Sequence, residues 1–142
     1  KKYYDFIKNN TSKEEWPLAI EKILTKIPEY EYGLNTFKAD ILAEHNMMEE
    51  LFRMCSNTGA ESFELYEKHL KPFYSKEILV AFHKYAEQQA AITDKEAYAN
   101  VARILKKMKQ YEGGKAIVEQ LLTKYRNTYK RRKNMMEALK EV

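Results

Sequence analysis

The sequence predicts an all-α protein built from stacked antiparallel helical hairpins. Its 142 residues include only 4 Gly and 3 Pro, which is too few for the turns that an all-β sandwich needs about every 8–12 residues. Apolar residues instead recur at the helical spacing i, i+3, i+4 and i+7 along the chain. With 44% hydrophobic and 13% aromatic residues, the chain is expected to bury one core and not to be disordered. We therefore predict a single all-α domain over residues 1–142 with about eight helices.

The N-terminal helices are expected within residues 1–30. Ser12 and Glu15 have the spacing of a capping box, in which each side chain satisfies a backbone N–H of the first helical turn. An apolar stripe follows as far as Ile27, and Pro28 is expected to end the helix because proline cannot continue the hydrogen-bond ladder.

Helical-hairpin repeats are expected over residues 31–127. Helix starts near Leu34, Ala60 and Lys95 mark the first helices of three hairpins, at an irregular spacing of about 26 to 35 residues. A tetratricopeptide array keeps a period of about 34 residues, so we expect a degenerate tetratricopeptide-like α–α superhelix. The residues expected to mark its helix ends and turns are Gly33, Gly59, Pro72, Gly113 and Gly114.

Three boundaries within this region follow from capping residues. A helix from about Ala60 to His69 is expected to be interrupted at Pro72, and Ser75 is expected to cap the next helix. Thr93 or Asp94 is expected to cap the helix that ends near Met108.

Charge is unevenly distributed along the chain. The net charge is +4, but residues 104–142 hold 11 basic and 4 acidic side chains, against 14 basic and 17 acidic ones in residues 1–103. Residues 128–142 are expected to form a basic capping helix, with its helical part over Tyr129–Leu139. A basic segment of this kind either attracts an acidic partner, including nucleic acid, or is an ordinary solvated helix face. The candidate nucleic-acid-binding residues are Lys124, Arg126, Lys130, Arg131, Arg132 and Lys133.

Catalytic and metal-binding motifs are missing from the sequence. There is no Gly-x-Ser-x-Gly or His-Glu-x-x-His motif, and Gly114-Lys115 lacks the first glycine and the Ser/Thr of a phosphate loop. The one cysteine, Cys55, excludes a disulfide framework within the chain and is expected to be a small buried hydrophobe. We therefore expect no enzyme, no catalytic residues, no metal site, no cofactor and no small-molecule substrate.

For a hairpin stack we expect the ligand to be a protein or a peptide. Such stacks present a concave face lined by the first helix of each pair. Exposed aromatic and charged side chains on that face are the predicted partner-binding residues, and they are Tyr66, Lys68, Tyr98 and Arg103. Tyr125 lies on an apolar stripe and is expected in the core, whereas Tyr129 suits core and contact equally.

Several segments resemble the C-terminal helical region of bacterial SWIM-type zinc-finger proteins. They include Lys13–Pro17, Ala39–Glu44 with Met48–Leu51, and Ala97–Lys109 followed by Gly113-Gly114. The zinc motif of that family, Cys-x-Cys and Cys-x-His, cannot lie in a chain with one cysteine, so the resemblance implies that the motif lies upstream in a longer protein. It also implies a DNA- or protein-associated context, and no zinc ligand is assigned to any residue.

The cytoplasm is the expected location. No apolar run is long enough to span a membrane, and the N-terminus lacks the apolar segment of a signal peptide. The sequence thus predicts a non-enzymatic helical-repeat domain for protein–protein interaction, with nucleic-acid binding through the basic C-terminal segment as the alternative.

Overall fold

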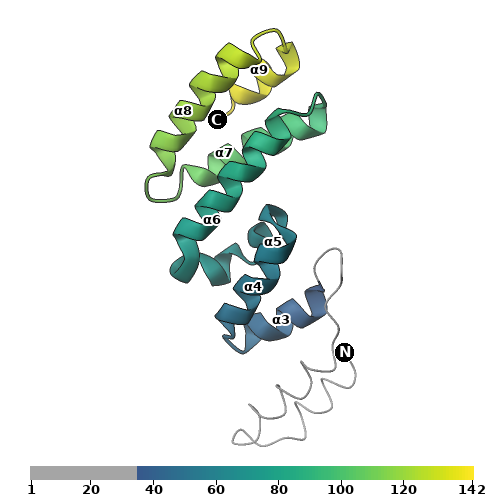
Figure 1. The fold of residues 1–142 in the computed structure, drawn as a ribbon, viewed down its shortest axis with the longest axis vertical. Coiled ribbons are helices and arrows are strands. Elements are labelled where there is room, and N and C mark those ends of the chain that lie inside the picture. The colour runs from purple at the N-terminus through teal and green to yellow at the C-terminus, as the bar shows by residue number, and fades with distance from the viewer. Residues whose placement is uncertain (1–34) are drawn as a thin grey trace, which may run out of the picture. The chain divides into compact units, whose positions relative to one another are not determined.

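A computed structural model describes residues 35–142, which form seven helices and contain no strand (Figure 1). The predicted all-α class is confirmed. The helices expected within residues 1–30 lie outside the described residues. The chain divides into two compact units, residues 1–58 and 59–142, and each is described by itself.

The first unit contributes α3 (Thr36–Glu44) and α4 (Met48–Thr58). The side chain of Asn35 caps α3 by accepting a 3.2 Å hydrogen bond from the backbone N–H of Lys38. Asn46, with φ of 56°, turns the chain between the two helices, which pack as a hairpin. The start of α3 at Thr36 lies close to the predicted helix start near Leu34.

The second unit contains five helices, α5 (Ala60–Leu65), α6 (Glu67–Ala90), α7 (Lys95–Met108), α8 (Gly114–Thr128) and α9 (Lys133–Leu139). Consecutive long helices run antiparallel. Lys71, near the start of α6, donates to the carbonyl of Gln110, just past the end of α7. Asn100, in α7, donates to Gln89 near the end of α6.

Alternate helices of this unit lie side by side and parallel, in two layers. In one layer, Arg103 of α7 pairs with Glu64 of α5, and Lys106 of α7 pairs with Glu141, just past the end of α9. In the other layer, Lys124 of α8 pairs with Glu87 of α6. Because neighbours in sequence are antiparallel and alternate helices are parallel, the second unit is a stack of helical hairpins.

The boundary between α5 and α6 differs from the prediction. The helix expected to reach His69 ends at Leu65, and α6 begins at Glu67 and continues past Pro72 with a kink. Proline removes one hydrogen bond and crowds the preceding turn, and the backbone accommodates it with a kink at Tyr74, where φ is −131° and ψ is 30°. The interruption predicted at Pro72 is thus present as this kink in α6, one residue before the predicted cap, Ser75.

The turns on either side of α7 follow the prediction. Asp94 is the N-cap, and its carboxylate accepts a 2.8 Å hydrogen bond from the backbone N–H of Glu96. Gly113 takes a left-handed conformation with φ of 78° before α8. Gly114 lies so close to the chain that a Cβ there would meet the carbonyl oxygen of Met108 at 1.7 Å.

The C-terminal helix is shorter than predicted. Helix α8 continues to Thr128 and α9 begins only at Lys133, so the helix expected over Tyr129–Leu139 loses its first turn to a loop. The loop is held by Arg132, whose guanidinium donates a 2.9 Å hydrogen bond to the carbonyl of Ala90 at the end of α6 and lies 4.3 Å from the centre of the Tyr129 ring.

The core of the second unit lies between the two layers. Phe82 of α6 packs edge-on against Tyr111, with ring centres 5.8 Å apart. Tyr125 is fully buried, which confirms the core prediction for this residue. The other large side chains that are fully buried in this unit are Leu70, Ile78, Ile104, Leu105, Met108 and Met135.

Across the described residues, no helix combines the length and the apolar character that a bilayer crossing requires.

Candidate functional site

An open groove of about 600 Å³ lies between α7 and α9 in the second unit. The two helices are parallel, and each contributes one stripe of residues at helical spacing. Its lining residues are Lys95, Tyr98, Ala99, Ala102, Arg103, Lys106, Lys107 and Gln110 from α7 and the turn after it, and Asn134, Ala138 and Glu141 from α9 and its C-terminal end.

Small side chains make the floor of the groove. Ala99 and Ala102 of α7 and Ala138 of α9 line it, and the alanine methyl group occupies little of the space between the helices. Ala102 is buried, Ala138 is partly exposed and Ala99 is exposed. The Tyr98 side chain is only 6% exposed, so it packs beneath the groove and leaves little of its ring accessible from the groove.

The rim of the groove is mostly basic. Four of its lining residues are cationic, and only Glu141 is acidic. Lys106 faces Glu141 at 3.8 Å, with both side chains at least half exposed, so this ion pair is weak. Lys95 has no ion pair among the described residues.

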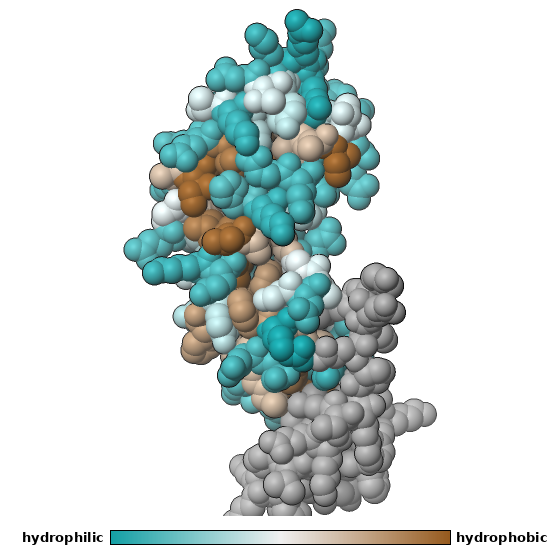
Figure 2. All heavy atoms as spheres, in the orientation of Figure 1, coloured by the Kyte–Doolittle hydropathy of each residue, from teal (hydrophilic) through white to brown (hydrophobic). Residues whose placement is uncertain are grey.

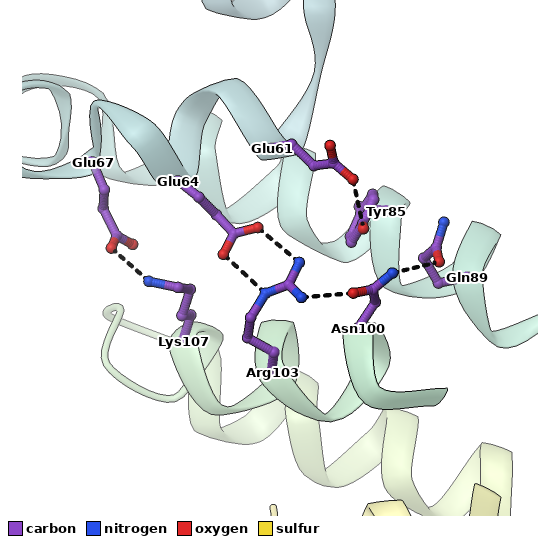
Figure 3. A network of polar contacts seen from close by, with 8 residues as sticks. All are labelled: Glu61, Glu64, Glu67, Tyr85, Gln89, Asn100, Arg103 and Lys107. Atoms are coloured by element: carbon purple, nitrogen blue, oxygen red, sulfur yellow. Dashed lines mark hydrogen bonds and ion pairs between the residues drawn. The ribbon is translucent and has the colours of Figure 1, made fainter. Parts of the chain in front are cut away.

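Two of the rim cations belong to a polar network that ties α7 to α5 and α6 (Figure 3). Arg103 donates from Nε and Nη2 to the two carboxylate oxygens of Glu64, at 3.1 and 3.0 Å, and from Nη1 to Asn100 at 2.6 Å. Lys107 pairs with Glu67 at 3.1 Å. The network therefore fixes the position of α7 against α5 and α6.

Tyrosine hydroxyls complete the network. Tyr111 donates to Glu67, and burial together with that carboxylate raises the pKa of the Tyr111 phenol above its usual range. Tyr85 donates to Glu61 at 3.1 Å, and partial burial with this hydrogen bond raises the pKa of Tyr85. Both phenols are thus held neutral as hydrogen-bond donors.

The four predicted partner-binding residues do not share one surface. Tyr98 and Arg103 line the α7–α9 groove, whereas Lys68 lines a separate hollow with Lys71, Ser75 and Tyr111. The expectation of exposure is wrong for Tyr66 and Tyr98, since each is 6% exposed. Tyr98 lies on α7, whereas Tyr66 lies at the turn between α5 and α6, and the packing of the hairpins covers both side chains.

The six predicted nucleic-acid-binding residues fall into two groups. Lys124 is engaged by Glu87 at 2.9 Å, and Arg132 holds the loop between α8 and α9. The other four side chains are exposed and make no ion pair or hydrogen bond with the part of the chain that the structure describes, and they are Arg126, Lys130, Arg131 and Lys133.

Sequence reasoning missed most of the groove. Lys95, Lys106 and Ala99 share one face of α7 with Tyr98 and Arg103, so helical spacing could have grouped them. Asn134 and Ala138 could not be found in this way, because their place opposite α7 depends on the α8–α9 turn.

Within residues 35–142, no three His, Cys, Asp or Glu side chains gather as a metal site would need. Cys55, in the first unit, is fully buried, and burial raises its thiol pKa to about 12. The thiol is therefore protonated at neutral pH, as expected for a small buried hydrophobe.

Comparison with known proteins gives no relative, since no family model, no curated protein and no solved structure matches the chain.

Proposed function

We propose that this chain is a non-enzymatic helical-repeat domain that binds a segment of a partner protein in the α7–α9 groove. One observation carries the proposal: an open groove of about 600 Å³ has a floor of small apolar side chains and a mostly basic rim. Grooves between helices commonly receive a helical or extended peptide, with apolar side chains on the floor and charged ones at the rim.

The charges of the rim favour an acidic partner segment. Arg103 and Lys107 are already neutralised by Glu64 and Glu67. Lys95 has no ion pair among the described residues, and Lys106 is held only by an exposed pair. A partner carboxylate near Lys95 or Lys106 would therefore gain an attraction without breaking the network that positions α7.

Selection from a library of short random peptides tests the proposal. We expect the selected sequences to combine acidic with apolar residues and to bind the chain in solution. Filling the groove with Ala99→Trp should abolish this binding. Ala116→Trp is the matched control, because Ala116 is also an exposed alanine on a helix, in α8, and does not line the groove. Equal binding by both variants would refute the groove as the site.

The finer family and cellular assignments are part of this proposal. The resemblance to SWIM-type zinc-finger proteins supports a bacterial protein, and the hairpin stack of the second unit supports a tetratricopeptide-like superhelix. A cytoplasmic location completes the proposal. A Cys-x-Cys and a Cys-x-His motif found upstream, in a longer protein that contains this chain, would support that membership independently of the groove.

A further inference from the structure

The end of α8, the loop after it and the start of α9 carry a second surface, which the proposed function does not use. Four cationic side chains lie within residues 126–133, one in the last turn of α8, two in the loop and one at the first residue of α9, and they are Arg126, Lys130, Arg131 and Lys133. All four are exposed. Figure 2 shows hydrophilic side chains over this end of the second unit. We call these four side chains the basic loop cluster.

Carboxylates do not neutralise the basic loop cluster. Residues 114–142 contain eight basic and only three acidic side chains. Of the three acids, Glu137 is held by Lys140 at 2.9 Å and Glu141 faces Lys106. The third, Glu119, lies in the first half of α8, about two turns before Arg126. The cluster thus presents a concentrated positive charge that an external anion can approach.

The loop that presents the cluster is fixed to the fold. Arg132 binds the carbonyl of Ala90 at 2.9 Å, and Lys124 binds Glu87 at 2.9 Å, so two cations of the basic segment anchor α8 and the loop to α6. The neighbouring cations therefore project from a defined framework, and the binding of a polyanion would not have to order the loop first.

The environment of Tyr129 indicates which part of a nucleic acid the cluster fits. Binding of single strands uses aromatic rings on which bases stack. Tyr129, the aromatic residue within this loop, has the Arg132 guanidinium 4.3 Å from its ring centre and the Tyr125 ring at 5.9 Å. With one face covered and another neighbour close, Tyr129 is a poor platform for a base. We therefore expect the basic loop cluster to contact the phosphate backbone of a nucleic acid and not its bases.

We propose that the basic loop cluster binds the phosphate backbone of duplex DNA without reading its sequence. Neutralisation of phosphates releases counterions, so binding to a duplex weakens steeply with salt. Four contacts predict a slope of about −3.6 in log K against log salt, which is a loss of roughly 100-fold between about 50 and 200 mM KCl.

Fluorescence anisotropy of the full chain with a labelled DNA duplex tests the proposal. The variant Arg126→Gln/Lys130→Gln/Arg131→Gln/Lys133→Gln should weaken binding at least tenfold and flatten the salt slope. The matched control, Lys68→Gln/Lys76→Gln/Lys84→Gln/Lys115→Gln, removes the same charge from exposed positions elsewhere in the second unit and should bind nearly as the parent does. Circular dichroism checks that both variants keep their helices.

Three results would overturn the proposal. The first is an equal loss of DNA affinity in the cluster variant and in the matched control, which would show that affinity depends on net charge and not on the basic loop cluster. The second is tighter binding of single strands with a dependence on sequence, which would mean base contacts. The third is binding to phosphatidylserine vesicles but not to the duplex, which would assign the cluster to a membrane surface. None of these outcomes depends on the groove, because Ala99→Trp leaves the cluster intact.

Discussion

Arg103 of α7 and Glu64 of α5 face each other as a two-pronged ion pair, with N–O distances of 3.1 and 3.0 Å. The planar guanidinium matches the two carboxylate oxygens, which gives the pair direction as well as attraction. The two residues are 39 positions apart in the sequence. They join the two helices of one layer beside the groove that we propose as the binding site.

The contribution of this pair to stability can be measured in a double-mutant cycle. We expect Arg103→Ala and Glu64→Ala to be coupled by about 0.5–1 kcal/mol in the free energy of unfolding, since the Arg103 side chain is 43% exposed and water screens the attraction. Urea denaturation of the parent, the two single variants and the double variant gives the value. Additive effects of the two substitutions would show that the pair stabilises nothing.

Two adjacent arginines should differ in their effect on stability. Arg132→Ala removes the hydrogen bond to the Ala90 carbonyl and the contact with Tyr129, so we expect a loss of about 1–2 kcal/mol. Arg131 is exposed and makes no side-chain contact of this kind among the described residues, so Arg131→Ala should change stability by less than about 0.5 kcal/mol. Thermal denaturation compares the two, and equal melting temperatures would contradict the structural role of Arg132.

Tyr98 should affect stability more than partner contact. With the side chain 6% exposed, Tyr98→Ala leaves a cavity and should cost roughly 3 kcal/mol, whereas Tyr98→Phe keeps the ring and should cost much less. Urea denaturation measures both. If the Tyr98→Ala variant unfolds at the same urea concentration as the parent, Tyr98 does not contribute to the packing of the core. That result would instead support the prediction that Tyr98 is an exposed partner-binding residue.

The reactivity of Cys55 should depend on pH in a specific direction. Burial raises its thiol pKa from 9.0 to about 12, and only the thiolate is alkylated. Iodoacetamide should therefore modify the native chain far more slowly than the unfolded chain at pH 9. Because the folded-state pKa is the higher one, the contribution of Cys55 to stability is full below pH 9 and is lost as the pH rises toward 12. Equal alkylation rates in the native and unfolded chains would contradict the burial.

Local features of the fold could be predicted from the sequence because their causes are local. The Asp94 cap and the breaks at Gly59 and Gly113 depend on side-chain capping and on positive φ, which short stretches of sequence reveal. The start of α9 could not be predicted, since Arg132 meets a carbonyl 42 positions away.

The candidate site was predicted only in part for a related reason. Periodicity placed Tyr66 and Tyr98 on helices, but which neighbour covers a helix face is decided by hairpin stacking. Arg103 was found as a charged residue of α7, yet its partner Glu64 belongs to another hairpin. Similarly, a run of basic residues does not tell which cations are engaged, as Lys124 and Arg132 are, and which four are left to form the basic loop cluster.

The most direct test of the proposed function follows alanine methyl groups by NMR. A peptide selected against the chain is titrated into protein labelled with carbon-13 at the alanine methyls. We predict that the methyl signals of Ala99, Ala102 and Ala138, which form the floor of the groove, shift with the bound fraction, and that the signal of Ala116 on α8 does not. Saturable binding that leaves the three floor methyls unchanged would contradict the proposal that the groove between α7 and α9 is where this protein holds its partner.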